Sequence, residues 1–182
     1  MDRSQEEFDD CYELCNNTLG QGTFAFVFEA KPRGESDSVA VKIYIKSRGH
    51  LHLVDNEIEA LKSLSHSNII KLRDYFHTQT AKYSYLVFEK IVGGELLKHI
   101  ININSHGVPY NEHQIRLKCK SILSALAHCH EHKVIHRDIK PENILMISRD
   151  DDADIKLIDF GLSVKASFDK DDLNNIYVTA IY

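Results

Sequence analysis

The chain has 182 residues, of which 43% are hydrophobic and 27% are charged, so it is long enough to form one or two globular domains. The formal net charge of −5 argues against a nucleic-acid-binding surface, and no apolar run approaches the length of a membrane span. The acidic start is unlike a signal peptide, and four scattered cysteines do not make a disulfide framework. These features favour a cytoplasmic or otherwise intracellular protein, the nucleus included.

Residues 1–11 are mostly polar, and we expect a frayed N-terminal tail there. From residue 12 to residue 28 the pattern becomes strand-like around a turn with Gly20 and Gly22. Two glycines let backbone N–H groups approach a ligand's phosphates without obstruction by a Cβ atom. An ordinary hairpin turn explains the same glycines, so the turn alone does not decide between the two interpretations.

The next predicted strand, residues 38–45, is rich in β-branched residues and contains one lysine, Lys42. Such a lysine either points to solvent or lies in a cleft, where it needs a carboxylate partner. The amphipathic helix predicted from His52 to Leu64 offers Glu57 and Glu59. We choose Glu57, because Glu59 sits away from the core-facing positions; two solvated surface glutamates are the alternative.

Two more strands are predicted, at about Leu72–His77 and Tyr83–Glu89, and a glycine pair then marks a domain boundary near residues 90–94. A long helix is predicted over Asn111–His132. Its expected apolar face consists of Ile115, Cys119, Ile122, Leu123, Leu126 and Cys129.

The end of that helix raises a zinc hypothesis, because His128 and His132 are one turn apart, with Cys129 and His136 nearby. The chain has no second ligand cluster and no glutamate at the spacing of a zinc protease. We therefore favour histidines that interact with the negative end of the helix dipole.

The most informative stretch runs from Val134 to Leu145 and is followed by Asp159-Phe160-Gly161. It places a candidate base at Asp138, a cation at Lys140 and an amide at Asn143, with a second carboxylate at Asp159. Phosphoryl transfer needs such a set, because negative charge spreads over oxygens that must be positioned and neutralised while one proton is accepted. The spacing H-R-D-x-K-x-x-N followed by D-F-G fixes about eight identities, so chance matches are on the order of one per 10^10 positions.

These motifs together resemble a eukaryotic protein kinase domain from about residue 12 to the end of the chain. Lys140, followed by Pro-Glu-Asn, resembles the serine/threonine subclass. The stretches 63–72 and 134–145 are similar to the calcium/calmodulin-dependent group. The chain ends at residue 182, before an Ala-Pro-Glu motif, so we expect a truncated domain whose long helix is partly uncovered.

The resemblance implies an α+β, two-lobed fold: a β-rich N-lobe with one key helix over residues 12–90, and an incomplete, mainly helical C-lobe over residues 91–182. It also implies transfer of the γ-phosphoryl group of Mg·ATP to a serine or threonine hydroxyl of a protein substrate. The alternative is a non-catalytic, kinase-like fragment that binds nucleotide or partners. Such proteins usually lack the lysine or one of the two aspartates, and Lys42, Asp138 and Asp159 are all present.

The resemblance also assigns roles. Asp138 would accept the proton of the substrate hydroxyl, and Lys140 would offset charge on the transferred group. Asn143 and Asp159 would hold Mg²⁺ ions.

Lys42, oriented by Glu57, would hold the α- and β-phosphates of ATP. The other cofactor-binding positions, from the glycine turn, the adenine pocket, the hinge and the linker, are Leu19, Gly20, Gln21, Gly22, Thr23, Phe24, Ala25, Val27, Ala40, Phe88, Glu89, Ile91, Glu95 and Leu145. Glu95 and Glu142 match positions that meet basic residues of the substrate in related kinases, which implies a preference for arginine or lysine near the target.

Arg137 matches a position that awaits a phosphate on the activation segment. The best-spaced residue there is Asn175, which cannot be phosphorylated. We hypothesise that Asp171 and Asp172 supply the negative charge, with modification of Tyr177 as the alternative.

Overall fold

Seven stretches of the chain are described by the computed structural model: residues 4–22, 25–45, 51–78, 82–105, 107, 111–150 and 152–166. The chain divides into two compact units. The sheet unit comprises Met1–Ile58 and Lys71–Lys90, and the helical unit comprises Glu59–Ile70 and Ile91–Tyr182. No helix within the described stretches is long and apolar enough to cross a membrane.

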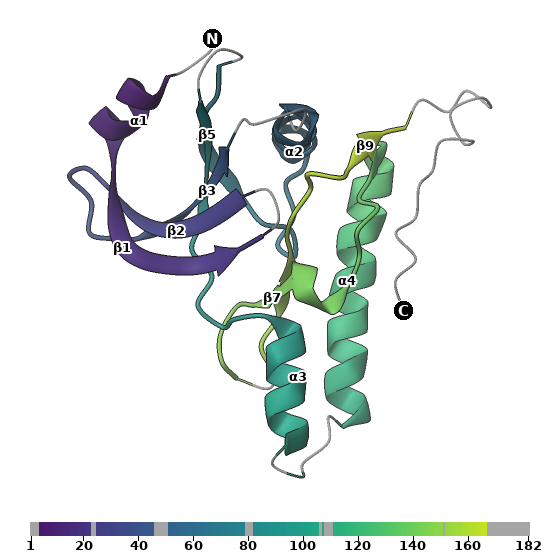
Figure 1. Ribbon diagram of the computed structural model, residues 1–182. Coiled ribbons are helices and arrows are strands. Elements are labelled where there is room, and N and C mark those ends of the chain that lie inside the picture. The colour runs from purple at the N-terminus through teal and green to yellow at the C-terminus, as the bar shows by residue number, and fades with distance from the viewer. Residues whose placement is uncertain are drawn as a thin grey trace. The chain divides into compact units, whose positions relative to one another are not determined.

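The sheet unit is built on a five-stranded antiparallel sheet with the strand order β1-β2-β3-β5-β4 (Figure 1). In chain order the strands are β1 (Tyr12–Gln21), β2 (Ala25–Pro32), β3 (Val39–Ile45), β4 (Leu72–Phe76) and β5 (Tyr83–Glu89). The register pairs Val27 with Lys42 and Ala40 with Phe88. Because residues opposite each other in antiparallel strands share a face, these four side chains lie on one face of the sheet.

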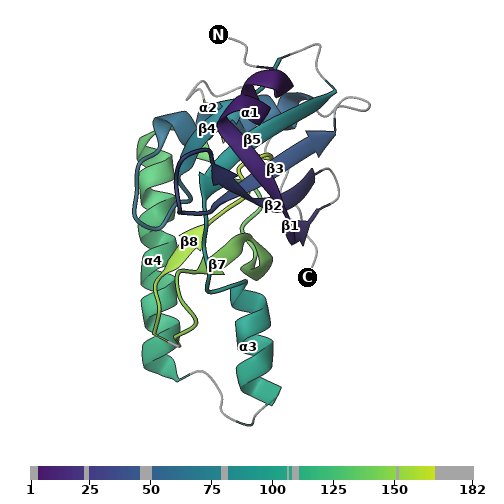
Figure 2. The same ribbon diagram turned by 90° about the vertical axis from the view of Figure 1, so that its left-hand side faces the viewer.

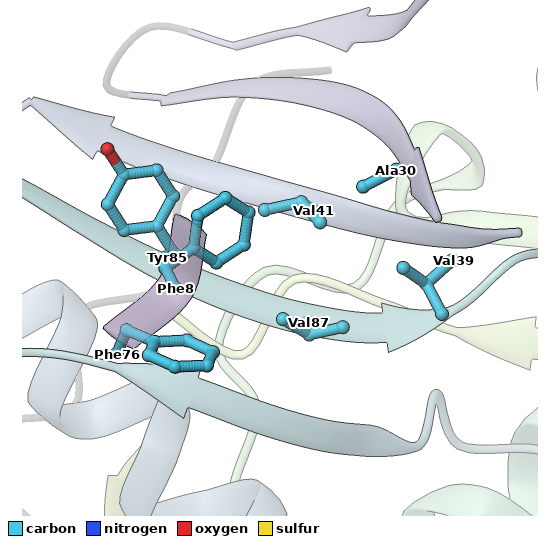
Figure 3. Close-up of a cluster of buried hydrophobic side chains, with 7 residues drawn as sticks. All are labelled: Phe8, Ala30, Val39, Val41, Phe76, Tyr85 and Val87. Atoms are coloured by element: carbon cyan, nitrogen blue, oxygen red, sulfur yellow. The ribbon is translucent and has the colours of Figure 1, made fainter. Parts of the chain in front are cut away.

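The opposite face of the sheet is covered by helix α1 (Gln5–Cys11). Its Phe8 is fully buried, stacks on Tyr85 with ring centroids 4.3 Å apart and meets Phe76 edge-on at 5.3 Å (Figure 3). The same cluster contains Ala30, Val39, Val41 and Val87.

The prediction of a frayed tail is therefore wrong for residues 4–11, the part of that segment that the structure describes. A capping box starts the helix, because the Ser4 side chain accepts from the Glu7 N–H and the Glu7 carboxylate accepts from the Ser4 N–H. The polar composition reflects only the exposed side of α1. One phenylalanine, fully buried, is enough to anchor a helix of seven residues on the sheet.

Helix α2 (Leu51–Ser63) agrees within one residue at each end with the helix predicted over His52–Leu64. Of the apolar positions expected from the helical spacing, Leu53, Ile58 and Leu61 are buried and Leu64 is half-buried. Val54, which that spacing does not include, is buried as well.

The helical unit contains α3 (Leu96–Ser105), α4 (Glu112–Glu131), a 3-10 turn η1 (Pro141–Asn143) and two small antiparallel sheets. In the first sheet β6 (Val134–Ile135) pairs with β9 (Val164–Lys165), and in the second β7 (Ile144–Met146) pairs with β8 (Ile155–Leu157). The β8 strand packs against α4 (Figure 2). The predicted α+β class, with a β-rich unit and a mainly helical unit, is confirmed.

The apolar face of α4 is only partly buried. Cys129 is completely buried, but Ile115 is 50% exposed and Leu123 is 66% exposed. The helix buries Lys118 instead, and its ammonium group donates a hydrogen bond to the carbonyl of Ala153. The packing of α4 against the short strands, not the apolar pattern alone, decides which side of this helix is covered.

The glycine pair at the predicted boundary has a packing role. A Cβ atom on Gly93 would lie 2.2 Å from the carbonyl oxygens of both Met146 and Ser148. The Gly93 N–H donates to the carbonyl of Met146 at 3.1 Å, and Gly94 has a positive φ of 83°. These two residues therefore let the linker lie directly against the end of β7.

Candidate functional site

Lys42 and Glu57 form a buried ion pair within the sheet unit. The Lys42 Nζ atom lies 3.0 Å from Oε1 and 2.9 Å from Oε2 of Glu57, whose side chain is 1% exposed. The alternative partner, Glu59, instead pairs with Lys165 at 2.9 Å within the helical unit. Glu57, the glutamate chosen from its spacing, is thus the one that meets Lys42.

A third member of this cluster, Tyr44, was missed by sequence reasoning. Its hydroxyl donates to Glu57 Oε2 at 2.6 Å, and its ring centroid lies 5.0 Å from Lys42 Nζ. Burial first, and then the charge of Glu57, raise the pKa of Tyr44 well above its usual range. The available signal was its position two residues after Lys42, which places both side chains on the same face of β3.

The predicted nucleotide-binding positions are distributed over both units. Val27, Ala40 and Phe88 share the sheet face that carries Lys42. Leu145 lies in the helical unit, where it forms an isolated antiparallel β-bridge with Glu95. The other described positions lie on the glycine turn and next to the linker: Leu19, Gly20, Gln21, Gly22, Ala25, Glu89 and Ile91. Thr23 and Phe24 lie outside the described residues.

The glycine turn is held by a hydrogen bond from the Gly22 N–H to the Ala25 carbonyl at 2.9 Å. Apart from its chain neighbours, a Cβ atom on Gly20 or Gly22 would meet no atom closer than 3.6 Å among the residues that the structure describes, which exclude residues 23 and 24 of this turn. Packing against the described residues therefore does not require glycine at either position, and close approach of a ligand stays a hypothesis for why glycine stands there.

Asp138, Lys140 and Asn143 come together within the helical unit. Asp138 Oδ2 accepts from Lys140 Nζ at 2.9 Å and from Asn143 Nδ2 at 2.8 Å. Turn η1 brings Asn143 back toward Asp138, where its amide also donates to the Asp138 carbonyl at 2.9 Å. The hydrogen bond with Asp138 raises the pKa of Lys140, so this lysine stays charged. Among the described residues, none donates a hydrogen bond to the other carboxylate oxygen, Oδ1.

His136 connects the Asp138 segment to the segment before Asp159. Its Nδ1 accepts from the Asp138 N–H at 3.2 Å, while Nε2 lies 2.9 Å from the Ile158 carbonyl. These partners assign the proton of a neutral ring to Nε2. Burial lowers the pKa of His136, which favours that neutral form. The ring also meets Phe160 edge-on at 4.6 Å, so both motifs are held by one buried histidine.

Asp159 and Asn143 carry the oxygens that suit a magnesium ion. Asp159 has a φ of 63°, and the Ile158 N–H before it donates to the Asn143 carbonyl at 2.9 Å. The amide nitrogen of Asn143 is engaged by Asp138, so its side-chain oxygen is the atom left to face a cation. Carboxylate and amide oxygens are hard ligands of the kind that Mg²⁺ prefers. The residues present therefore fit a magnesium ion.

Arg137 has a φ of 68°, and its Nε donates to the carbonyl of Leu162. The residues proposed to regulate it, Asp171, Asp172, Asn175 and Tyr177, lie outside the described residues. Their part in regulation stays a hypothesis.

The histidines considered for zinc are engaged in the fold. His128 Nε2 accepts from the Ser65 N–H at 3.2 Å, and its ring lies 5.2 Å from that of His66 and 4.2 Å from that of His132. Cys129 is completely buried. In the stretches that the structure describes, no three or more His, Cys, Asp or Glu side chains are grouped so as to hold a metal ion.

The two glutamates expected to meet basic substrate residues lie on the helical unit. Glu95 accepts from Lys98 Nζ at 2.6 Å in a surface pair, and Glu142 is exposed. A surface pair of this kind contributes little stability, so an incoming cation can replace Lys98 at small cost.

The chain is similar in sequence to known protein kinases. A family model described as "Protein kinase domain" matches residues 14–182. The chain is 36% identical over 163 residues to calcium-dependent protein kinase 5 of Plasmodium berghei (strain Anka). The aligned region covers 89% of this chain and 28% of that protein. It is 38% identical over 160 residues to calcium/calmodulin-dependent protein kinase type IV of Mus musculus, with coverages of 88% and 32%. It is 39% identical over 157 residues to calcium/calmodulin-dependent protein kinase cmkB of Emericella nidulans, with coverages of 84% and 37%. The chain thus spans 28% to 37% of the length of these relatives.

Proposed function

Because the chain belongs to the protein kinase family, we propose that it transfers the γ-phosphoryl group of Mg·ATP to a serine or threonine hydroxyl of a protein substrate. The observation that carries the proposal is the environment of Asp138. Lys140 and Asn143 hold one carboxylate oxygen, while no described residue donates a hydrogen bond to the other. A carboxylate fixed in this way can accept a proton from a substrate hydroxyl at Oδ1.

Lys140 has a second task in this proposal. Its ammonium group lies 2.9 Å from Asp138, so it is next to the point where the substrate oxygen and the transferred group meet. The raised pKa of Lys140 keeps its charge, which offsets negative charge on the phosphoryl group during transfer.

Magnesium, when bound, neutralises and orients the phosphate oxygens of ATP. The side-chain oxygens of Asn143 and Asp159 would hold it, and the hydrogen bond from the Ile158 N–H to the Asn143 carbonyl links the two segments. His136 fixes the position of Ile158, next to Asp159, relative to Asp138. One ring nitrogen bonds to the Ile158 carbonyl and the other accepts from the Asp138 N–H.

In the sheet unit, Lys42 binds the α- and β-phosphates and Glu57 keeps its ammonium group in place. The backbone N–H groups of the glycine turn cover the phosphates. Val27, Ala40 and Phe88 supply the apolar surface for adenine from the same sheet face.

We assign the substrate class from two features of the helical unit. The Pro-Glu-Asn sequence after Lys140 is of the serine/threonine type, and Glu95 and Glu142 present carboxylates at the surface. A peptide with arginine or lysine close to the target serine complements that charge.

The test is transfer of labelled phosphate from Mg·ATP to serine peptides with and without flanking arginines. We expect faster transfer to the arginine peptide and a loss of about 10²–10⁴-fold in Asp138→Asn, which removes the base. Thermal unfolding with Mg·ATP supplies an independent readout, because bound ligand raises the melting temperature and Asp159→Ala should abolish that rise. A rise in melting temperature without phosphate transfer would contradict the proposal and favour a non-catalytic nucleotide-binding protein.

A further inference from the structure

We propose that Tyr44 is a positioning residue for the phosphoryl transfer, whose hydroxyl fixes the Glu57 carboxylate and whose ring supports the Lys42 ammonium group. This inference rests on the proposed kinase function. Tyr44 touches both members of the ion pair: Oη lies 2.6 Å from Glu57 Oε2, and Lys42 Nζ lies 5.0 Å from the ring centroid.

Glu57 is a buried carboxylate that needs hydrogen-bond donors from the protein. Its side chain is 1% exposed, so water cannot satisfy the carboxylate, and an unsatisfied buried carboxylate is strongly unfavourable. Lys42 bonds to both carboxylate oxygens, and Tyr44 supplies a further donor to Oε2. A short O–H···O⁻ hydrogen bond of this kind is charge-assisted and restricts the carboxylate to one orientation.

Binding of phosphate by Lys42 changes the hydrogen bonds of the ion pair. Its donors must then be shared between the nucleotide and Glu57, which weakens the hold of Lys42 on the carboxylate. Tyr44 keeps its hydrogen bond to Glu57 through this exchange, because its hydroxyl donates its single proton to the carboxylate. Burial and the neighbouring negative charge raise the pKa of Tyr44, so its hydroxyl remains a donor. The carboxylate therefore stays in place to orient Lys42.

The ring of Tyr44 also contacts the Lys42 ammonium group. An ammonium group over an aromatic face is attracted by the ring's quadrupole, and here the ring is buried as well. Phenylalanine at position 44 would keep this contact and lose only the hydroxyl. Leucine would lose both, so the two substitutions separate the two contributions.

A matched control exists in the same sheet. Tyr85, on β5, is 4% exposed, as is Tyr44, but it lies in the cluster with Phe8 on the opposite face. Tyr85→Phe removes the same atom from the same unit without touching Lys42 or Glu57. A general effect of losing a buried hydroxyl would appear in both variants.

The primary experiment measures acetylation of Lys42 by acetic anhydride in the purified protein without ATP, using mass spectrometry and the exposed Lys71 as internal reference. An amine that is held less firmly by its carboxylate reacts faster. We expect about tenfold faster labelling in Tyr44→Phe, the equivalent of one hydrogen bond to a charged group. Tyr44→Leu should label faster still, and Tyr85→Phe should match the wild type.

A second measurement covers the case in which Tyr44→Phe is less stable. In a Glu57→Gln background the Tyr44→Phe substitution should change Lys42 labelling by less than about twofold, because the charge that couples them is gone. The same tenfold change in that background would overturn the inference. So would equal labelling of Lys42 in the wild type and in Tyr44→Phe.

The kinetic readout is kcat/KM for Mg·ATP, which should fall about tenfold in Tyr44→Phe and stay within about twofold in Tyr85→Phe. Equal losses in the two variants would mean that Tyr44 has a structural role only. If the wild type transfers no phosphate, the proposed function fails, and the labelling experiment still decides whether Tyr44 positions Lys42.

Discussion

The two polar clusters of this protein are built in opposite ways. In the sheet unit, Lys42 and Glu57 are 15 residues apart on different elements, and Glu57 is 1% exposed. In the helical unit, Asp138 and Asn143 are five residues apart in one turn, and the Lys140 side chain of that cluster is 37% exposed. The first cluster forms only where Glu57 of α2 meets two side chains of β3, whereas the second follows from the local course of the backbone.

The difference determines how each cluster responds to change. The charges of a buried ion pair have lost their hydration, so removing one partner leaves an uncompensated charge in the interior. A partly exposed pair is screened by water, which replaces a lost partner. We therefore expect loss of Glu57 to affect folding, and loss of Lys140, the most exposed member of the helical cluster, to affect mainly chemistry.

The largest effect is expected for Glu57→Ala. It leaves the largely buried Lys42 ammonium and the buried Tyr44 hydroxyl without their carboxylate partner, and the free energy of unfolding should fall by about 3–5 kcal/mol in urea titrations. Glu59→Ala is the matched control, because this glutamate forms an exposed pair with Lys165 and its loss should change stability by less than about 0.5 kcal/mol. Equal effects of the two substitutions would refute the role of burial.

Asn68 tests whether the large loss of stability expected for Glu57→Ala comes from burial and from distant partners, and not from membership of the sheet unit. It lies in the helical unit but bonds to residues 86 and 87 positions away: its amide donates to Asp154 Oδ1 at 2.8 Å and to the Ile155 carbonyl at 2.9 Å. Asn68→Ala should therefore cost about 2–4 kcal/mol by the same titration. Asn104→Ala, at an exposed position of α3, should be nearly neutral, and a loss below about 1 kcal/mol for Asn68→Ala would contradict the comparison.

Lys140→Ala should separate stability from activity. Because the lysine is 37% exposed, its loss should lower the free energy of unfolding by less than about 1 kcal/mol. The rate of phosphate transfer should fall by far more than that, since the charge beside Asp138 is lost. A stability loss as large as that of Glu57→Ala, measured in parallel, would show that the two clusters do not differ as we infer.

The smallest effect is a pH dependence within the helical unit. Burial, then the neighbouring His132 and His66, lower the pKa of His128, and Glu131 opposes them. His128 therefore binds a proton more readily in the unfolded chain than in the folded protein. The stability that neutral His128 contributes is complete above about pH 6.5, the pKa of histidine in an unfolded chain. It is lost as the pH falls from there toward the lower pKa of His128 in the folded protein.

The substitution His128→Gln removes this titration while keeping an acceptor for the Ser65 N–H. Its unfolding free energy should decline less between pH 7.5 and pH 5.5 than that of the wild type. His130→Gln, an exposed neighbour on the same helix, should retain the wild-type decline. A variant of His128 that declines as steeply as the wild type would remove this histidine from the explanation.

The sequence by itself determined the family, which is confirmed, and the grouping of Asp138, Lys140 and Asn143. These residues lie within six positions, so the local backbone brings them together whatever the rest of the chain does. The pairing of Lys42 with Glu57 was also predictable, since a lysine in a buried strand needs an acid and the helix offered two glutamates, of which the spacing favours Glu57.

Only the tertiary structure decided which other residues join these clusters. In the sequence, Tyr44 looks like any aromatic residue of a strand, and only the structure shows that Glu57 of α2 lies against its hydroxyl. Phe8 reads as a lone apolar residue in an acidic tail until the sheet offers Tyr85 and Phe76 to cover it. Lys118 reads as a surface lysine until the β7–β8 turn brings the Ala153 carbonyl to it. In each case the deciding partner is distant in sequence, and its approach depends on the packing of whole elements, which local patterns do not encode.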